Sequence, residues 1–294
     1  MSELKVNSLG ITELKKMNYN QLISVIGETN RPPGGIRTVI NFIKNLNIRK
    51  NNRILEIGTS TGFTAIELAK LTNCKITAID INEDSLAIAK KNAVAYGVEN
   101  NITFLKADAT DLPFEDEEFD FIFAGNIISY IPQREKALFE YKRVLTNNGV
   151  LFVTPMYYIE TPSDRLISQI RDSLKMDIRI DFEDYWDSFY NIEGLDIFLT
   201  ESYKFDYKTD KQISDYVNDI LKTNRELIDA RISDQETKDY FKKIYKSYIY
   251  LYRDNLFKMA YKEIYARKSN FSFDRELFTS TKFMKGMNNY GSRY

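Results

Sequence analysis

A strand, turn and helix signature in residues 54–80 constrains the fold of this chain more than any other feature. An apolar run over residues 54–57 is followed by the turn Gly58-Thr59-Ser60-Thr61-Gly62, and a second apolar run ends at Asp80. Glycines at such a turn allow backbone conformations that side chains disfavour and let a ligand approach closely. An acid that ends the second strand is placed to accept hydrogen bonds from ribose hydroxyls. The pattern predicts the nucleoside-binding half of a doubly wound α/β domain.

Segments of strand and helix character alternate along the first half of the chain. The expected strands are residues 53–57, 75–80, 102–105, 119–124 and 149–154, and the expected helices between them are 63–72, 83–96 and 133–145. This alternation indicates a mainly parallel sheet with helices on both faces. Two later strands, over 195–207 and 260–267, bring the expected sheet to seven strands.

The 294 residues exceed the usual size of one domain, so we expect additions to the α/β core. Further helices are expected over residues 11–28, 36–47, 163–175, 211–231 and 234–254. The expected organisation is an N-terminal helical cap segment (1–50), the α/β core (51–207), a helical lid insertion (208–256), the last core strand (257–268) and a C-terminal tail (269–294).

The composition excludes several classes of chemistry. The chain has no histidine, which removes Ser-His-Asp and Cys-His catalysis and histidine metal sites. Its single cysteine, Cys74, excludes an internal disulfide and a cysteine zinc cluster and favours a reducing compartment. No apolar stretch approaches the roughly 18 residues of a membrane span, and the first residues lack a signal peptide pattern. We therefore expect a cytoplasmic protein without a membrane partner.

On the residues of the turn and of Asp80, the chain resembles the class I S-adenosylmethionine-dependent methyltransferases. The motifs that carry the resemblance lie in the first 155 residues, and Ser60 stands where the family usually has the middle glycine of GxGxG. Ser60 also argues against a pyrophosphate cofactor, which needs a bare helix N-terminus. The resemblance implies methyl transfer from S-adenosylmethionine, which leaves S-adenosylhomocysteine. It also implies that the last strand lies antiparallel beside the fifth.

Methyl transfer suits a chain without histidine. The sulfonium group is already an activated electrophile, so that alignment and desolvation supply much of the catalysis. The resemblance implies that Glu56 helps to place the methionine end of the cofactor. It further implies that Gly58, Ser60 and Gly62 form the turn beneath the methionine and ribose portions, and that Asp80 binds the ribose hydroxyls.

Further cofactor contacts follow from the same resemblance. Ile81 is expected to pack on one face of the adenine, Asp108 to accept a hydrogen bond from its amino group, and Ala109 to serve a ring nitrogen through its backbone amide. Gly125 and Asn126 correspond to the place where the methionine portion meets the incoming nucleophile.

The acids also have structural alternatives when each is taken alone. Glu56 has the position of an ordinary acid at a strand end, Asp80 that of a helix N-cap near Asn82, and Asp108 that of a loop acid that caps a turn. Their joint spacing favours the binding site. From the N-terminal segment, Tyr19 and Arg31 are expected to close over the cofactor's carboxylate and sulfonium.

The candidate residues for orienting or deprotonating the acceptor follow the fourth and fifth strands. Asn126, Tyr130, Tyr157 and Tyr158 lie at carboxyl ends of strands, where a doubly wound sheet opens its crevice. A tyrosine there is expected to orient or deprotonate the acceptor, although packing is an alternative role for any one of them. The stretch over residues 181–191, together with the helical insertion, is expected to shape the acceptor pocket, with Tyr185, Trp186 and Phe189 as its aromatic residues, and its composition favours an apolar or cationic acceptor.

The sequence after the fourth strand argues against two methyltransferase subgroups. It reads Gly125-Asn126-Ile127-Ile128, which lacks the Asn/Asp-Pro-Pro-Tyr/Phe tetrapeptide of amino-purine methylases. It also lacks the acids that hold magnesium in catechol-type enzymes, so no metal is expected. The expected substrate is the oxygen, nitrogen or carbon of a small molecule or short peptide.

Two other functions remain open. Residues 238–294 carry 13 basic and 5 acidic side chains together with 15 aromatics, a composition that an RNA or protein methyltransferase would use. Phe241, Tyr245, Tyr248 and Tyr252, however, follow helical spacing and favour a buried stripe, so a nucleic-acid partner is not expected. The second alternative is a non-catalytic partner subunit that binds the cofactor. The aromatic tail and the amphipathic N-terminal helix leave a homodimer open.

Overall fold

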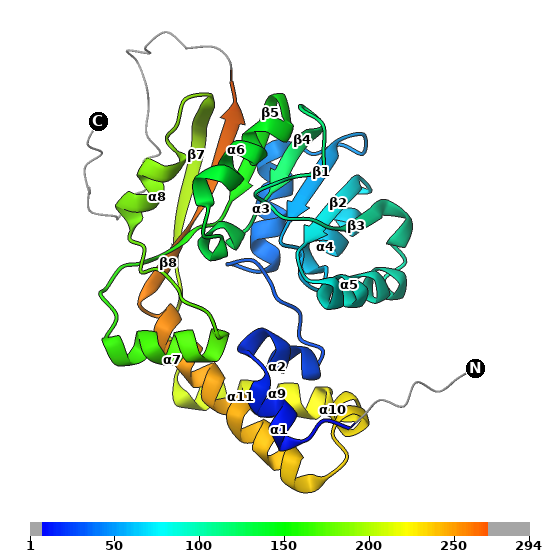
Figure 1. Ribbon diagram of the computed structural model, residues 1–294, viewed down its shortest axis with the longest axis vertical. Coiled ribbons are helices and arrows are strands. Elements are labelled where there is room, and N and C mark those ends of the chain that lie inside the picture. The colour runs from blue at the N-terminus through cyan, green and yellow to red at the C-terminus, as the bar shows by residue number, and fades with distance from the viewer. Residues whose placement is uncertain (1–7, 270–294) are drawn as a thin grey trace.

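The computed structural model describes residues 8–269, which form an α/β core and a helical cap on one side of it (Figure 1). The core sheet has the order β3-β2-β1-β4-β5-β8-β6, and β7 pairs with β8. The described strands are β1 (Arg53–Ile57), β2 (Lys75–Asp80), β3 (Ile102–Lys106), β4 (Phe119–Phe123), β5 (Leu145–Val153), β6 (Met156–Tyr158), β7 (Leu195–Lys204) and β8 (Met259–Lys268). Strands β1 to β5 are parallel to one another, and β8 is antiparallel to β5, β6 and β7. The predicted doubly wound α/β fold is confirmed.

The described sheet has eight strands where seven were expected. The additional strand is the short β6, which continues β5 after a break at Thr154-Pro155. Proline has no N–H to donate to a sheet, so the ladder stops there and resumes at Met156. Strand β8 is long enough to pair with both segments, at Val153↔Ile264 and at Met156↔Tyr261.

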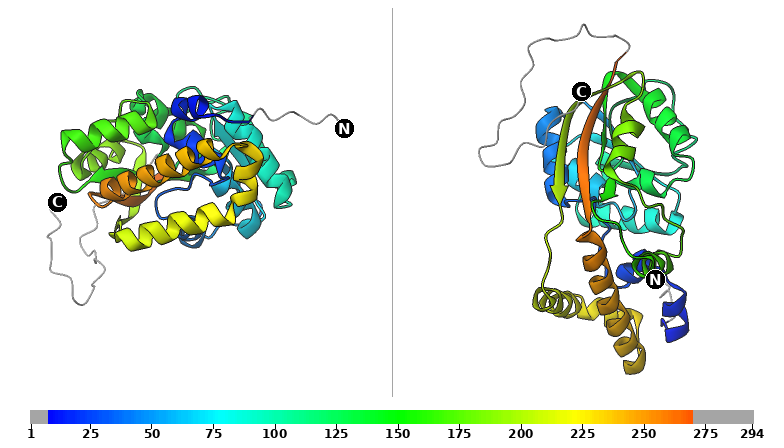
Figure 2. Two further views of the ribbon diagram at one scale, coloured as in Figure 1. Left: turned by 90° about the horizontal axis from the view of Figure 1, so that it is seen from below. Right: turned by 90° about the vertical axis from the view of Figure 1, so that its left-hand side faces the viewer.

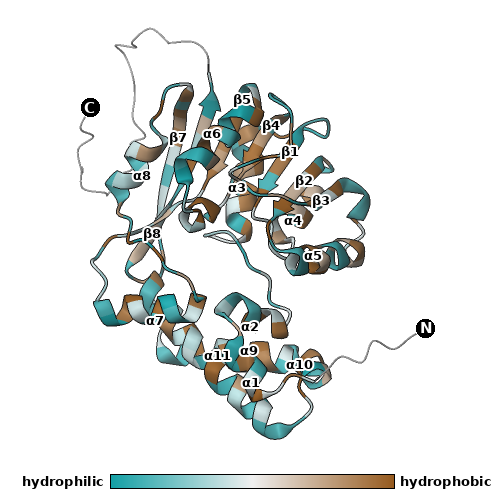
Figure 3. Ribbon diagram, viewed as in Figure 1, coloured by the Kyte–Doolittle hydropathy of each residue, from teal (hydrophilic) through white to brown (hydrophobic). Residues whose placement is uncertain are grey.

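Helices cover both faces of the sheet because successive strand residues alternate between two cores. Leu151 packs in one apolar cluster with residues of α6 (Arg134–Val144) and α8 (Glu183–Tyr190). Phe152 packs in the other, with residues of α3 (Ile36–Leu46), α4 (Phe63–Thr72) and α5 (Glu83–Ala95). Figure 3 shows the apolar character of the central strands. The short 3-10 turns are η1 (Glu99–Asn101) and η2 (Ile127–Tyr130).

The cap is built from the N-terminal segment and from two segments of the second half of the chain. Its helices are α1 (Ile11–Lys16), α2 (Tyr19–Val25), α7 (Asp164–Leu174), α9 (Asp210–Thr223), α10 (Arg225–Arg231) and α11 (Gln235–Leu256). They enclose an apolar cluster of their own, in which Leu14, Phe241 and Tyr245 are fully buried. Figure 2 shows β8 following directly from α11, so that the long strand joins cap and core. Helices α9, α10 and α11 lie between β7 and β8, where an insertion was expected.

Two expected helices are each divided by an asparagine. The expected helix over 11–28 breaks before Asn18, whose side chain accepts a hydrogen bond from the Gln21 amide while its own amide donates to the Gln21 side chain. This reciprocal cap starts a new helix. The helix over 211–231 likewise divides into α9 and α10 at Asn224. The aromatic stretch after Asp181 forms α8, a helix that the sequence did not predict.

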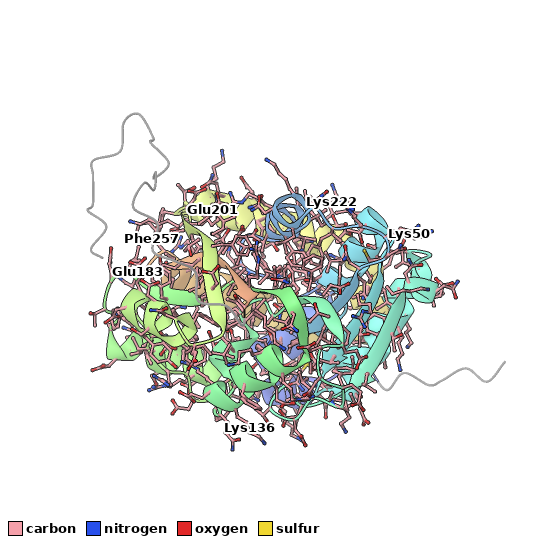
Figure 4. All side chains as sticks on the ribbon, turned by 90° about the horizontal axis from the view of Figure 1, so that it is seen from above. Lys50, Lys136, Glu183, Glu201, Lys222 and Phe257 are labelled. Carbon is pink, nitrogen blue, oxygen red and sulfur yellow. The ribbon has the colours of Figure 1, made fainter. Side chains whose placement is uncertain are left out.

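The outer surface is rich in charge. The labelled side chains of Lys50, Lys136 and Glu183 lie at the outline of the molecule in Figure 4.

Inside the cap, Phe241 and Tyr245 are buried, which confirms the predicted stripe for these two residues. None of the helices described between residues 8 and 269 is long and apolar enough to cross a membrane. Except for Ser269, the expected C-terminal tail (269–294) lies outside the described residues.

Candidate functional site

A cavity of about 840 Å³ lies between the carboxyl ends of the core strands and the cap. Its volume is within the range of small-molecule sites, about 300–1,000 Å³. Walls from β1, β2 and β4 meet walls from the N-terminal segment, α7, α11 and the start of β8. The sequence-predicted residues that line it are Tyr19, Arg31, Glu56, Gly58, Ser60, Asp80, Ile81, Gly125, Asn126 and Tyr130.

The glycine turn brings the backbone close to the loop after β4. Gly58 has φ +79°, and a Cβ added there would lie 2.7 Å from the Ile127 side chain. Ser60 also adopts a left-handed conformation, with φ +49°. Gly62 does not line the cavity; it faces Ala89 of α5, whose Cβ would lie 3.0 Å from an added Cβ. Gly58 thus shapes the cavity wall, whereas Gly62 packs α4 against α5.

Asp80 joins two loops at the edge of the cavity. One carboxylate oxygen accepts from the Ser60 amide at 2.8 Å and the other from the Asn82 amide at 2.9 Å. The N-cap of α5 is Asn82, whose side chain accepts from the amides of Asp84 and Ser85. Each oxygen of Asp80 keeps capacity for another donor, so its carboxylate remains able to bind hydroxyl groups of a ligand.

Glu56 is a buried acid at the end of β1, with 3 % of its surface exposed. The Thr59 hydroxyl donates to its carboxylate at 2.6 Å. Burial nevertheless raises the pKa of Glu56 to about 7. Among the described residues, no cation lies within salt-bridge distance of it. Nearby, the buried Thr61 hydroxyl lines the cavity with no hydrogen-bond partner in the described part of the chain. A ligand with a cationic group fits this corner, because a buried carboxylate needs a partner.

Asn126 organises the opposite wall. Its side-chain oxygen accepts from the Ser129 hydroxyl at 2.7 Å and from the Met156 amide at 3.0 Å, which ties the loop after β4 to β6. Desolvation raises the pKa of the Tyr130 phenol, and a hydrogen bond with the Asn126 side chain only partly offsets the increase. The phenol is therefore neutral near pH 7 and can donate a hydrogen bond to an acceptor, but it is unsuited to act as a base.

The structure does not bring Tyr157 to this cavity, which corrects its prediction as a site residue. Side chains alternate along a strand, and Met156 and Tyr158 line the cavity while Tyr157 does not. The Tyr157 hydroxyl instead donates to Glu183 at 3.3 Å, in a separate hollow of about 930 Å³. Tyr158 lines the cavity in its place.

Asp108 and Ala109 also lie outside the cavity lining. The Asp108 carboxylate accepts from the amide and the hydroxyl of Thr110, at 2.8 and 2.9 Å. These bonds hold the pKa of Asp108 below its ordinary value. Ala109 is buried in the core cluster of α6. Their contacts with adenine stay a prediction.

The expected acceptor wall of Tyr185, Trp186 and Phe189 is wrong. Trp186 is fully buried and donates through its indole N–H to the Met156 carbonyl at 3.0 Å, and all three rings pack in or against the core. Their helix, α8, covers the sheet because its aromatic side chains recur with helical spacing. The preceding residues Arg179 and Asp181 reach the cavity instead.

Several cavity residues come from the cap and were missed by the sequence analysis. Tyr252 of α11 packs against Tyr19 with the two rings tilted and their centroids 4.1 Å apart. The Tyr158 hydroxyl donates to Asn255 at 2.8 Å. No local motif marks these individual positions, because the segments that meet here are far apart in the sequence. The expected insertion over residues 208–256 indicated only the segment, and the predicted stripe included Tyr252.

Between residues 8 and 269, no group of three or more histidine, cysteine, aspartate or glutamate side chains is placed to hold a metal ion. The absence of a metal from the reaction stays an expectation of the sequence.

The core of the chain is similar to the sequences of known methyltransferases. Residues 48–193 match a family model described as a methyltransferase domain. An uncharacterized protein of Haemophilus influenzae is 29% identical over 177 residues, which cover 60% of this chain and 70% of that protein. The ubiquinone/menaquinone biosynthesis C-methyltransferase UbiE of Azotobacter vinelandii is 30% identical over 128 residues, covering 43% of this chain and 49% of UbiE.

Solved structures share the fold. The crystal structure of MccD protein has a TM-score of 0.69 at 24% identity and covers 82% of this chain and 100% of its own. Phosphoethanolamine N-methyltransferase 2 of Haemonchus contortus, in complex with phosphomonomethylethanolamine and S-adenosylhomocysteine, has a TM-score of 0.65 at 17% identity and covers 84% of this chain and 56% of its own. At these identities the likeness is one of fold.

Proposed function

Because the chain belongs to the class I S-adenosylmethionine-dependent methyltransferases, we propose that it transfers the methyl group of S-adenosylmethionine to an oxygen, nitrogen or carbon of a small molecule or short peptide. The observation that carries the proposal is the buried Glu56 carboxylate, which lines the cavity without a cation within salt-bridge distance among the described residues. An amino-acid ammonium group is the partner that this carboxylate lacks.

The proposed cofactor site uses the core half of the cavity. Glu56 receives the ammonium group, the Gly58 turn lies beneath the methionine and ribose portions, and Asp80 accepts from the ribose hydroxyls. Ile81, 69 % exposed at the end of β2, offers its apolar surface to the adenine. Tyr19 and Arg31 close the site from the cap side. When bound, the cofactor supplies an activated methyl group.

The proposed acceptor site uses the half beside the cap. Tyr130, held by Asn126, donates a hydrogen bond that orients the acceptor atom. In-line transfer requires the nucleophile at roughly 3 Å from the methyl carbon, so positioning is the main contribution of these residues. The cap excludes water from the reacting atoms. No side chain of this wall is proposed as a general base, so an acceptor atom that carries a proton loses it to solvent before the acceptor enters the site or after the methylated product leaves it.

The relatives support a small acceptor. UbiE is named for C-methylation in quinone biosynthesis, and its similarity covers about half of its length. The cavity lies beneath the cap rather than on an open surface, which also favours a small molecule over a nucleic acid. The buried Cys74 accords with the reducing interior of a cell, and a cytoplasmic location is part of the proposal.

The test is turnover with methyl-labelled S-adenosylmethionine. The purified chain is incubated with panels of phenols, amines, activated carbon acids and short peptides, and both S-adenosylhomocysteine and labelled products are measured. The proposal expects label in at least one panel, lost in Asp80→Asn. Stoichiometric cofactor binding without turnover in any panel would favour the non-catalytic partner subunit instead.

A further inference from the structure

We propose that the acceptor is an uncharged, planar and apolar molecule of aromatic or conjugated type, held in the cap half of the cavity. The inference rests on the proposed function, since it names the substrate class of the same site. Three observations carry it: the distribution of methionines, the hydrogen bonds of the tyrosines, and the pairing of the charges.

The methionines of the described residues all line this cavity. They come from four separate places: Met17 between α1 and α2, Met156 at the start of β6, Met176 just after α7, and Met259 at the start of β8. Methionine is among the residues most often buried in a core, yet none of the four is fully buried, although Met17 also packs against the apolar cluster of the cap. Their flexible, polarisable side chains suit contact with apolar and aromatic surfaces.

The tyrosines of the same wall have their hydroxyl groups engaged. The Tyr158 hydroxyl binds Asn255 at 2.8 Å, and the Tyr252 hydroxyl lies 3.0 Å from that of Ser173. Tyr130 is bonded to Asn126. With their hydroxyls engaged, Tyr158 and Tyr252 offer the cavity mainly the apolar surface of their rings, whereas Tyr130 keeps the O–H that donates to the acceptor atom. Ring-to-ring contact is favourable for a planar ligand.

The charges of the acceptor wall are already paired. Asp181 binds Arg134 at 2.8 Å and Arg179 at 3.4 Å, so its carboxylate is not free to anchor a cationic acceptor. The Arg179 guanidinium is also 4.6 Å from the centroid of the Tyr185 ring. A phosphorylated acceptor would compete with Asp181 for this cation. Glu56 and Asp80 lie on the core side, in the proposed cofactor half, and Arg31, whose guanidinium is 4.9 Å from the centroid of the Phe63 ring, is assigned to the cofactor's carboxylate. Because the charges of the acceptor wall are already paired, the wall favours an uncharged acceptor over a cationic one.

The methionines themselves report the binding. Protein labelled with ¹³C at the methionine methyl groups is saturated with S-adenosylhomocysteine and titrated with 2-naphthol, and the signals are assigned with single Met→Leu variants. We expect saturable ring-current shifts of the signals of Met17, Met156, Met176 and Met259. The charged analogues 2-naphthyl phosphate and 2-naphthylmethylammonium are expected to bind at least about tenfold more weakly, which corresponds to about 1.4 kcal/mol.

Two variants of Met176 sharpen the test. Met176 is 37 % exposed, so substitution there does not require repacking of a core. Met176→Glu introduces a charge and is expected to weaken 2-naphthol binding at least about tenfold, whereas Met176→Leu preserves it. Leu71→Glu, at an exposed apolar residue outside the cavity, is the control and is expected to leave 2-naphthol binding unchanged.

The outcomes separate this inference from the proposed function. If S-adenosylhomocysteine binds but 2-naphthol leaves the four methionine signals in place, or a charged analogue binds as tightly, the acceptor class is overturned and the methyltransferase proposal stands. If S-adenosylhomocysteine does not bind the wild-type protein, the proposed function itself fails.

Discussion

Glu56 shows how one residue links stability to binding. Its carboxyl is buried at the end of β1, and its pKa of about 7 lies above the ordinary 4.5 because desolvation outweighs the hydrogen bonds that it receives. Between these two pH values the folded protein holds a proton that the unfolded chain releases. The contribution of Glu56 to stability is therefore fully present below about pH 4.5 and is lost as the pH rises towards 7.

Glu56→Gln is expected to stabilise the ligand-free protein at high pH. The amide cannot ionise, so at pH 8 its free energy of unfolding is expected to exceed that of the wild type by up to about 3 kcal/mol. At pH 4 the two proteins are expected to differ little. Urea unfolding at both pH values measures this. A variant that is less stable than the wild type at pH 8 would contradict the buried, cation-free environment.

The same group sets the pH dependence of binding. The ammonium group of S-adenosylhomocysteine favours the ionised form of Glu56, so affinity is expected to rise about tenfold between pH 6 and pH 8 for a group with a pKa near 7. Calorimetric titration at the two pH values measures the rise. Glu56→Gln is the control, and an equal rise in that variant would assign the pH dependence to another group.

Alanine variants of Gly58 and Gly97 form a matched pair that tests the close backbone approach at the glycine turn. Both have positive φ, +79° and +69°, but an added Cβ meets Ile127 at 2.7 Å at Gly58 and nothing within 4 Å at Gly97. Each alanine variant is expected to lose about 1 kcal/mol of stability from the backbone alone. Only Gly58→Ala is expected to lose affinity for S-adenosylhomocysteine, by at least about tenfold, because Ile127 must move. Equal affinities of the two variants would count against the close approach.

At the level of elements, Arg134 fastens the loop after β4 to the segment before α8. This arginine, 2 % exposed at the start of α6, donates to the Ser129 carbonyl at 2.9 Å and binds Asp181 at 2.8 Å. Its guanidinium lies 4.8 Å from the centroid of the Trp186 ring. The ion pair therefore holds η2, with Tyr130, against the wall that Asp181 contributes.

Breaking this pair is expected to be costly, and removing both partners less so. Arg134→Met leaves Asp181 buried with only the longer contact to Arg179, and a loss of about 3–5 kcal/mol is expected. The double variant Arg134→Met/Asp181→Leu is expected to recover much of it, because no buried charge then remains. Urea unfolding of the four proteins in the cycle measures the coupling. Additive losses would show that the two charges act independently.

The elements also show what the sequence could and could not predict. The β1, α4 and β2 unit was predictable because its signals are local: a strand, a glycine turn and an acid at a fixed distance. Helix α8 was missed because its aromatic residues suggested an exposed pocket wall, whereas Trp186 packs under β6. Tyr157 was misplaced because a shift of one residue along a strand reverses the face. The cap required pairing of Tyr19 with Tyr252, a contact that no local pattern encodes.

At the scale of the whole molecule, the cavity exists because the N-terminal helices, α7 and the helices between β7 and β8 lie on the same side of the sheet. The N-terminal helices and the helices between β7 and β8 share one apolar cluster, separate from the two clusters of the core (Figure 1). Core residues supply the acids of the proposed cofactor half, and the methionines and tyrosines of the other half come from the cap and from the core strands and loops that face it. A ligand that spans both halves would couple them, and it would stabilise the folded protein by mass action.

The most direct test of this account is a calorimetric titration of S-adenosylhomocysteine into the wild type, Asp80→Asn and Asp120→Asn. Asp120 is a matched strand carboxylate that accepts from the Arg53 amide at 2.9 Å and does not line the cavity. The account predicts stoichiometric binding to the wild type and to Asp120→Asn, with affinity at least about tenfold weaker in Asp80→Asn. Absence of binding to the wild type, or equal affinity in all three proteins, would contradict the assignment of this cavity as the cofactor site.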